Sequence, residues 1–448
     1  MNAVKASQIE QLEEQVQNLL LSNLVTGEDS SDPPKTYTYI CPDKKRYPHQ
    51  WLWDSCFHII VNSHLNVELA RRELETLLKG QREDGLVPHM IYWKPNLSII
   101  DKFVKRYYLD KKHSSLTQTP LLPQALRAMY LQTRDPDDLE TFLPRIKRYY
   151  DFLYETRRFS EDPIPLLNII HSWESGIDNS PIYDKALGIK GRFLTLKWMK
   201  SLIRQLKVLR DCNWEMEKIR ERDYFLYKDL LFNCAYIQGC RELSFLYEKI
   251  GHDEISKSFE KRAKDLEKLV IKHCWHAESS LFYGLYGQKN QMDTVKSAMG
   301  LIPLILDGLP LNKATSLVED HLLNEKEFWP DFPVPSVALD SPHYTLKTPL
   351  LWRGPTWINI NWFLIKGLRK HNFENESFEL TQRTFQLVEK SGFREFYSPK
   401  TGKGMGAQHF GWSTLILDTL KSKFNTDSDF ILNAEYRHVK KGPVWVGG

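Results

Sequence analysis

The chain has 448 residues, of which 42% are hydrophobic and 26% are charged, so it is long enough for a large buried core and has the composition of a globular protein. Its net charge of +4 is small for this length and argues against a nucleic-acid-binding surface. No apolar run of about 18 residues is present, and so no membrane-spanning segment is expected.

The N-terminal stretch, residues 5–24, has apolar residues at helical spacing and lacks the apolar core of a signal peptide. We therefore predict an N-terminal helix and a cytoplasmic protein. The six cysteines show no CxxC or Cys/His ligand spacing, so we expect buried, reduced thiols. No metal or organic cofactor is expected, and a homo-oligomer is left open.

An aromatic cluster follows a polar linker at residues 28–34. Tyr47, Gln50, Trp51 and Trp53 come just before a helical pattern that begins at Asp54, which is well placed as its N-cap. Exposed aromatic faces bind the flat, apolar faces of sugar rings. This cluster therefore suits the rim of a sugar site, with Asp54 available to ring hydroxyls. A packed aromatic corner is the alternative.

The next segments alternate between helices and loops. Amphipathic patterns predict helices at 66–80, which stops at Gly80, at 124–133 and at 140–157. Gln118 lies in the polar loop before the second of these helices. The helix–loop rhythm therefore places polar side chains between helices rather than along them.

The stretch HSWESGIDNSP, residues 171–181, is a Gly- and Pro-punctuated loop that places two carboxyl groups beside an indole. A carboxyl group against an aromatic face is desolvated, which disfavours its charged form. A carboxylic acid that stays protonated near neutral pH can act as a general acid. From the residues alone, Glu174 and Asp178, both near Trp173, fit this role equally well.

The second half of the chain continues the rhythm. Helical patterns occupy 190–210, 223–250 and 253–273, followed by two shorter helices and then by helices at 357–367 and 376–391. The Pro-rich stretch at 328–357 has too many aromatic residues for a flexible linker, and we expect an ordered functional loop. A hairpin-like loop at 392–412 leads into a closing helix. The tail, residues 424–448, shows no clear pattern.

The sequence has roughly a dozen helical segments and almost no two-residue alternation. Loops with chemically useful residues recur after every second helix. We therefore predict an all-α protein formed by one catalytic domain, residues 1–448, that folds as an (α/α)6 barrel with long loops over one end. A helical solenoid is the architectural alternative.

A second carboxyl group, that of Glu395, also lies in an aromatic loop, so Asp178 has a candidate partner for a reaction that uses two carboxyl groups. Glycoside cleavage needs two carboxyl groups, one to protonate the leaving oxygen and one to activate water or to attack the sugar. The nearby TGKGMG turn is not framed by a strand and a helix, and no Gly-Lys-Ser/Thr follows it, so we reject a P-loop. His171, His343 and His409 show no metal-ligand spacing, and no nucleophilic serine elbow is present.

Four motifs, YPHQWLWDS, WESGIDNSP, WRGPTWININW and EFYSPKTGKGMGAQHFGW, together resemble glycoside hydrolase family 63. More narrowly, they resemble its short bacterial and plant members, the mannosylglycerate and glucosylglycerate hydrolases. The resemblance implies an (α/α)6 barrel and hydrolysis of a small α-glucoside or α-mannoside with inversion of configuration. It further implies that Asp178 is the general acid and that Glu395 is the general base.

The same resemblance implies a sugar pocket formed mainly by the other motifs. The expected substrate-binding residues are Tyr47, Gln50, Trp51, Trp53, Asp54, Gln118, Trp173, Glu174, Trp352, Arg353, Trp357 and Trp412. Leu351 departs from the aromatic residue that we expect before WRGP in the glycerate-directed subgroup. Arg353, Lys347 and Lys105 are candidates for holding a substrate carboxylate. A trehalase-like hydrolase on the same fold and a non-catalytic carbohydrate-binding protein are the alternatives.

Overall fold

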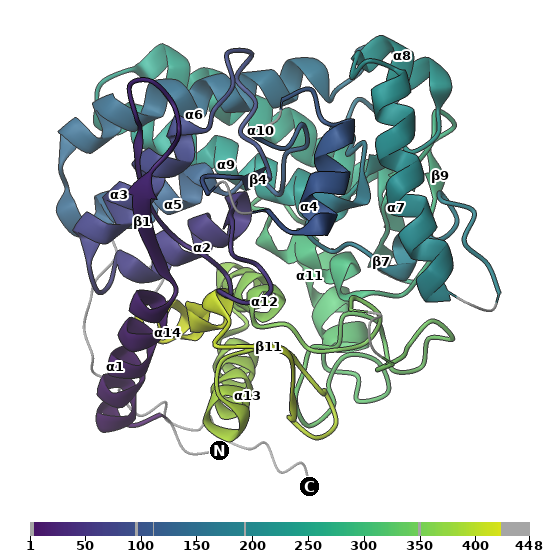
Figure 1. Cartoon of the computed structure of the whole chain (residues 1–448). Coiled ribbons are helices and arrows are strands. Elements are labelled where there is room, and N and C mark those ends of the chain that lie inside the picture. Colours follow the sequence, from purple (N-terminus) through teal and green to yellow (C-terminus); the bar gives the residue numbers. More distant parts are fainter. Residues whose placement is uncertain (1–3, 95–96, 111, 192–193, 348–350, 423–448) are drawn as a thin grey trace, which may run out of the picture.

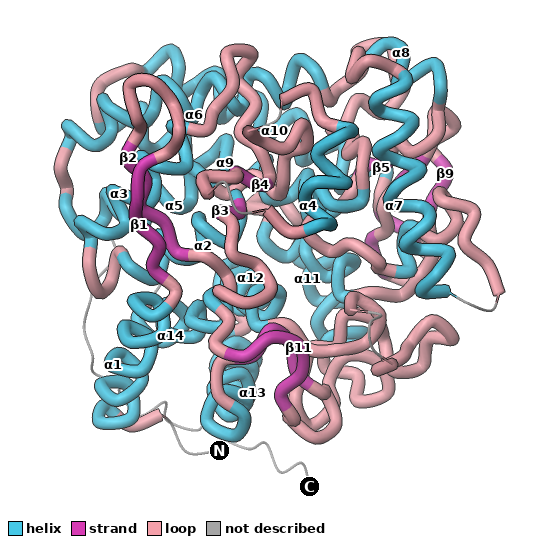
Figure 2. Tube along the Cα trace, viewed as in Figure 1, coloured by secondary structure: helices cyan, strands magenta, loops and turns pink. Residues whose placement is uncertain are grey.

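The computed structural model describes residues 4–94, 97–110, 112–191, 194–347 and 351–422. Helices dominate, and the strands are short (Figure 2). The α-helices are α1 (Ala6–Ser22), α2 (Leu52–Asn62), α3 (Val67–Lys79), α4 (Ile99–Val104), α5 (Leu122–Thr133), α6 (Pro136–Thr156), α7 (Leu194–Asp211), α8 (Met216–Arg222), α9 (Leu230–Lys249), α10 (Asp253–His273), α11 (Leu311–Ser316), α12 (Ile358–Lys370), α13 (Glu374–Ser391) and α14 (Leu415–Lys421).

The strands form small antiparallel pairs and one three-stranded sheet. They are β1 (Leu24–Glu28) with β2 (Thr36–Ile40), β3 (Gln50–Trp51) with β4 (Met90–Ile91), β6 (Trp275–His276) with β7 (Leu281–Phe282), β10 (Arg394–Tyr397) with β11 (Gly404–Gln408), and β5 (Tyr227–Lys228) with β8 (Leu285–Tyr286) and β9 (Gln291–Met292).

Six inner helices close into a ring within the described part of the chain. The ring runs through α2, α5, α9, the 3-10 helix η4 (Ala298–Ile305), α12 and α14, each in contact with the next, and α14 returns to α2. Outside them pack α3, α6, α10, α11 with its π-helical continuation η5 (Leu317–Leu322), α13 and α1. Figure 1 shows the N-terminal α1 and the C-terminal α14 side by side. The predicted (α/α)6 barrel is confirmed, and ring closure excludes a solenoid.

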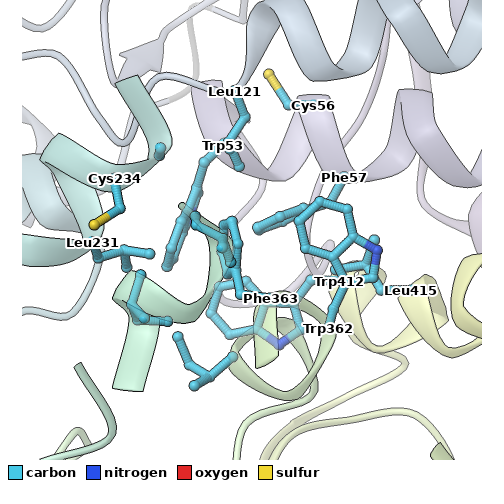
Figure 3. Packing of buried hydrophobic residues seen from close by; sticks show 14 of the residues in the cluster. Trp53, Cys56, Phe57, Leu121, Leu231, Cys234, Trp362, Phe363, Trp412 and Leu415 are labelled. Carbon is cyan, nitrogen blue, oxygen red and sulfur yellow. The ribbon is translucent and has the colours of Figure 1, made fainter. Parts of the chain in front are cut away.

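The sequence explains which helices lie inside. Every residue of α2 is buried, and α9 is buried on most of its circumference, as expected for helices that are apolar nearly all round. In contrast, α3 and α10 bury one stripe and expose charged residues. In the core, Phe57 of α2 packs edge-on against Trp362 and Phe363 of α12 (Figure 3).

Several expectations need correction at the level of elements. The predicted linker at 28–34 lies largely in the connection of the β1–β2 hairpin, which the sequence analysis missed. Helix α2 begins at Leu52, so Trp51 is its N-cap and Asp54 lies in its first turn. The hairpin-like loop at 392–412 is confirmed as β10–β11. The predicted C-terminal tail, 424–448, lies outside the described residues.

The helices α4, α7 and α8 stand outside the twelve-helix arrangement. They share a satellite hydrophobic cluster, separate from the main core, whose members include Tyr92, Val104, Leu206 and Ile219. All six cysteines lie in the described part and are buried and unpaired, as predicted. None of the described helices has the length and apolar character needed to cross a membrane.

Candidate active site

A cavity of about 580 Å³ collects side chains from loops that are distant in the sequence. Several lining segments lead directly into inner helices, namely residues 42–51 into α2, Gln118 into α5, residues 351–357 into α12 and residues 410–412 into α14. Because the inner helices of such a ring run in the same direction, the loops that enter them gather at one end. The expected arrangement of loops over one end of the barrel is therefore present.

Most of the predicted site residues lie together on the cavity wall. The eleven that line it are Tyr47, Trp51, Trp53, Asp54, Gln118, Trp173, Asp178, Trp352, Trp357, Glu395 and Trp412. Gln50, Glu174 and Arg353 are not among the lining residues, and each makes contacts elsewhere in the described part of the chain.

Glu395 is held from two sides. The hydroxyl of Tyr47 donates to Oε1 at 2.9 Å, and the backbone N–H of Ala407 donates to Oε2 at 2.8 Å. Burial raises the pKa of this carboxyl above its usual value, while both hydrogen bonds and the guanidinium of Arg46, 3.8 Å from Oε2, oppose the increase. The result is a carboxylate with fixed orientation, which suits a general base.

A glycine makes room for this carboxylate. Gly406 has φ +68°, and a Cβ at this position would lie 2.5 Å from Oε2 of Glu395. Glycine adopts positive φ at little cost and presents no side chain. The Gly-rich turn noted in the sequence thus lets the β10–β11 hairpin fold closely over the carboxyl group.

Asp178 lines the same cavity from the loop at 171–181. Burial, with a smaller contribution from the negative charge of Glu395, raises its pKa to about 7. This loop approaches the floor of the cavity closely, because a Cβ on Gly176, at φ +78°, would lie 2.5 Å from the ring of Trp53. Asp178 is therefore a carboxyl group that can carry a proton near neutral pH, as a general acid requires.

The floor of the cavity, by which we mean the surface lined by Trp53, Trp352, Trp357 and Trp412, is built of indoles. Trp352 stacks in parallel on Trp357, and Trp412 meets Trp53 edge-on with ring centres 5.5 Å apart. The indole nitrogen of Trp357 is buried and has no hydrogen-bond partner among the described residues. Flat apolar faces with a free donor suit a sugar ring, which has apolar faces and polar edges.

Asp54 contributes a further acidic group to this floor. Its Oδ1 is buried without a hydrogen-bond partner among the described residues, and burial raises its pKa to about 7. Nearby, Oε1 of Gln118 accepts a hydrogen bond from the backbone N–H of Trp53. A buried polar atom without a partner is costly, so Oδ1 of Asp54 is a ready acceptor for a ligand hydroxyl.

Glu174 supports the loop at residues 171–181, named the acid loop for its two carboxyl groups, through contacts outside the cavity. Its carboxylate pairs with Arg157 at 2.6 Å and accepts hydrogen bonds from the backbone N–H groups of Ile170 and Thr117. All of its strong partners are protein groups, and it does not line the cavity. The structure thus separates two carboxyl groups that the sequence left equal, because only Asp178 of the pair faces the cavity.

Arg353 likewise points away from the cavity. Its guanidinium forms a bidentate pair with Asp184, at 2.6 and 2.8 Å, and Nε donates to the side chain of Asn179. Gln50 is fully buried, where it accepts from the indole of Trp93 and donates to Ser55. These polar residues hold the loops of the site instead of forming its surface.

The other proposed carboxylate-holding cations lie outside the cavity lining. Lys347 is exposed, and Lys105 lies 4.4 Å from the centre of the Tyr92 ring. The lining cations that the sequence analysis missed are Lys45 and Arg46, and their position directly before Tyr47 was the available signal. His49 and Asp101, which pair at 3.2 Å, and Trp198 were also missed.

The structure assigns His171 a structural role, as expected. It is buried, its Nδ1 accepts from the backbone N–H of Trp173, and burial lowers its pKa to about 3. No group of three potential metal-ligating side chains occurs among the described residues.

Comparison with known proteins places this arrangement in a family. Residues 47–413 match the mannosylglycerate hydrolase MGH1-like glycoside hydrolase domain. The chain belongs to this family. It is a short member of glycoside hydrolase family 63, and its activity class is hydrolysis of glycosides.

Individual members of the family show how far the similarity extends. A mannosylglycerate hydrolase from Thermus thermophilus is 28% identical over 84% of this chain and 95% of its own. A glucosylglycerate hydrolase from Mycolicibacterium hassiacum is 24% identical over 84% of this chain and 92% of its own. The crystal structure of the GH63 mannosylglycerate hydrolase of T. thermophilus with Tris and D-glycerate has a TM-score of 0.77 and 26% identity, covering 91% of this chain and 99% of that one.

Proposed function

We propose that the protein is an inverting α-glycosidase in which Asp178 protonates the glycosidic oxygen and Glu395 activates the attacking water. The observation that carries the proposal is the meeting of these two groups in one cavity. One has its pKa raised to about 7 by burial, and the other is oriented by two hydrogen bonds. Inversion needs one acid and one base on opposite faces of the sugar.

The leading substrates are glucosylglycerate and mannosylglycerate. Support comes from the named activities of the relatives and from the D-glycerate bound by the T. thermophilus enzyme. On this chain, Lys45 and Arg46 line the cavity beside Tyr47, where they would attract a carboxylate. Leu351, at the position noted in the sequence, also lines the cavity. A cytoplasmic location stays a prediction.

The roles of the two carboxyl groups are tested by product and by leaving group. A panel of glucosylglycerate, mannosylglycerate, kojibiose, nigerose and trehalose is incubated with the enzyme, and NMR follows the first anomer released, which should be β. Asp178→Asn and Glu395→Gln should each lower turnover by about 10²–10⁴-fold. An aryl glycoside whose leaving oxygen needs no proton should restore turnover in Asp178→Asn but not in Glu395→Gln.

The matched control is Asp331→Asn, an exposed carboxyl group outside the cavity lining, which should retain full activity. Near-normal turnover of Asp178→Asn on the natural class of substrate would remove Asp178 from the mechanism. Release of the α-anomer first would replace inversion by retention. Tight sugar binding with no release from any glycoside would favour a carbohydrate-binding protein.

A further inference from the structure

Residues from two separate hydrophobic clusters line the cavity. Trp53, Trp352, Trp357 and Trp412 at one end belong to the main core. At the other end, the lining residues Met90, Tyr92 and Val104 belong to the satellite cluster, against which Trp51 and Trp173 also pack. The cavity therefore has an indole end, next to Asp54, and a second end built from different elements.

The second end lies between α4 and α7. Ile100 and Val104 of α4 and Trp198 and Leu202 of α7 all line it, and Figure 1 shows the two helices close together on one face. Ile100 is 74% exposed although it faces a cavity, so it offers apolar surface to a ligand. Exposed apolar surface at a cavity rim commonly marks a binding site.

The charges at the second end are already engaged. Among the lining ionisable groups there, His49 and Asp101 pair with each other at 3.2 Å, and burial lowers the pKa of His89 to about 3. Lys105 lies over the Tyr92 ring. The lining cations Lys45 and Arg46 belong to the segment before Tyr47. The positive charge of that segment attracts acidic substrates into the cavity, whereas the wall formed by α4 and α7 offers apolar surface to the leaving group.

The acid loop connects the two ends. Trp173 packs on the satellite cluster and Ile177 on the main core, so the loop spans both clusters, and Asp178 follows directly after Ile177. A general acid donates its proton to the oxygen of the leaving group. The leaving group should therefore occupy the second end, with the sugar on the indole floor.

We propose that the second end is an aglycone subsite for an apolar group, and that the enzyme hydrolyses α-glycosides of alkyl and aryl alcohols in addition to acidic small glycosides. This inference rests on the proposed function. Water adds to the anomeric carbon, the bond from that carbon to the glycosidic oxygen breaks, and the alcohol leaves with the proton of Asp178. Water's own proton passes to Glu395.

The test compares n-hexyl with methyl α-glucosides and α-mannosides, whose leaving alcohols have similar acidity. Each methylene that enters an apolar site should contribute about fourfold, so kcat/KM for the hexyl glycoside should exceed that for the methyl glycoside at least about tenfold. Ile100→Asn and Leu202→Gln should each lower this ratio at least about threefold, because each makes the wall polar.

Neighbouring positions on the same helices supply the controls. Ile99, 86% exposed, and Ile203 do not line the cavity, so Ile99→Asn and Ile203→Gln should leave the ratio unchanged. A ratio near one in the parent enzyme, or equal effects of lining and neighbouring substitutions, would overturn the subsite.

The subsite and the proposed function can be tested separately. If methyl glycosides are hydrolysed without a preference for hexyl, the subsite is wrong and the proposed function stands. If no glycoside is hydrolysed, the proposed function fails, and quenching of tryptophan fluorescence then decides the subsite. Tighter binding of hexyl than of methyl glycoside, lost in Leu202→Gln but not in Ile203→Gln, would support it, and equal binding would refute it.

Discussion

At the scale of single residues, the two carboxyl groups of the site differ in what surrounds them. Burial dominates at Asp178 and raises its pKa to about 7. At Glu395 burial also raises the pKa, but the hydroxyl of Tyr47, the backbone of Ala407 and the charge of Arg46 counteract it. Environments that push two pKa values apart assign the acid and the base.

These directions predict a bell-shaped pH dependence of kcat/KM. In the proposed mechanism, activity needs Asp178 protonated and Glu395 ionised, so it should fall above about pH 7 as Asp178 loses its proton, and at acid pH as Glu395 gains one. Tyr47→Phe removes a donor to the ionised form of Glu395. The acid limb should therefore move to higher pH while the alkaline limb stays in place.

The alkaline limb has to be assigned to Asp178 or to Asp54, because burial raises the pKa of Asp54 to about 7 as well. An aryl glycoside with an activated leaving group separates them. If Asp178 causes the limb, it should flatten for this substrate, which needs no protonation. Tyr286→Phe, outside the cavity lining, serves as the control for Tyr47→Phe, and an unmoved acid limb in Tyr47→Phe would contradict the assignment.

The sequence does not predict which polar residues of a motif face the cavity. Gln50, Glu174 and Arg353 belong to the same motifs as lining residues, but their partners are Trp93, Arg157 and Asp184, which are distant in sequence. In irregular loops no periodicity relates neighbours to a common face. Most of the residues that the resemblance implied line one cavity, whereas the orientation of each side chain depended on tertiary contacts.

At the scale of elements, Arg353 joins two loops of the site. It stands in the segment that enters α12. Its partner Asn179 follows directly after Asp178, and its partner Asp184 comes shortly after the same loop. A buried bidentate pair fixes geometry as well as distance. We infer that Arg353 is a positioning residue for the general acid.

Arg353→Lys keeps the charge and loses the bidentate geometry, so we expect kcat to fall about a hundredfold with a much smaller change in KM. Arg241→Lys is the matched control, since Arg241 pairs with Glu267 and Asp307 away from the cavity. Both variants should lose stability in thermal unfolding, but only Arg353→Lys should lose turnover. Parallel losses of stability and turnover in both variants would reduce Arg353 to a general structural role.

Elements with a strong period were predicted well and short ones were not. The helix predicted at 253–273 has the same bounds as α10, because an apolar stripe and an opposite charged face both continue along its whole length. The β1–β2 hairpin was missed since each strand has five residues and its turn resembles a polar linker. Strands of two residues, such as β3 and β4, give no alternation at all.

At the scale of the whole molecule, the ring closes where α14, the last described helix, contacts α2, the first inner helix. The helix–loop rhythm predicted closure but not the joint. Asp418 of α14 accepts hydrogen bonds from His64, which follows α2, and from the indole of Trp362 in α12. It also lies 3.5 Å from Nζ of Lys366. One buried carboxylate thus ties three inner segments together.

This joint should make the stability of the ring depend on pH. Burial opposes ionisation of Asp418, but Lys366 and His64, with the hydrogen bond from Trp362, hold its pKa well below its usual value.

A lowered folded-state pKa stabilises the protein fully above the unfolded-state pKa of about 3.9, and this contribution is lost as the pH falls further. Asp418→Asn should therefore lower the free energy of unfolding by about 3–5 kcal/mol at neutral pH, because it removes the buried negative charge that Lys366 and the Trp362 indole face. In urea titrations the difference from the parent protein should narrow as the pH is lowered from about 5 to about 3, while Asp320→Asn, an exposed carboxyl group on η5, should show no difference at either pH. A loss that stays constant across this range would mean that Asp418 holds the ring by shape alone and not by charge.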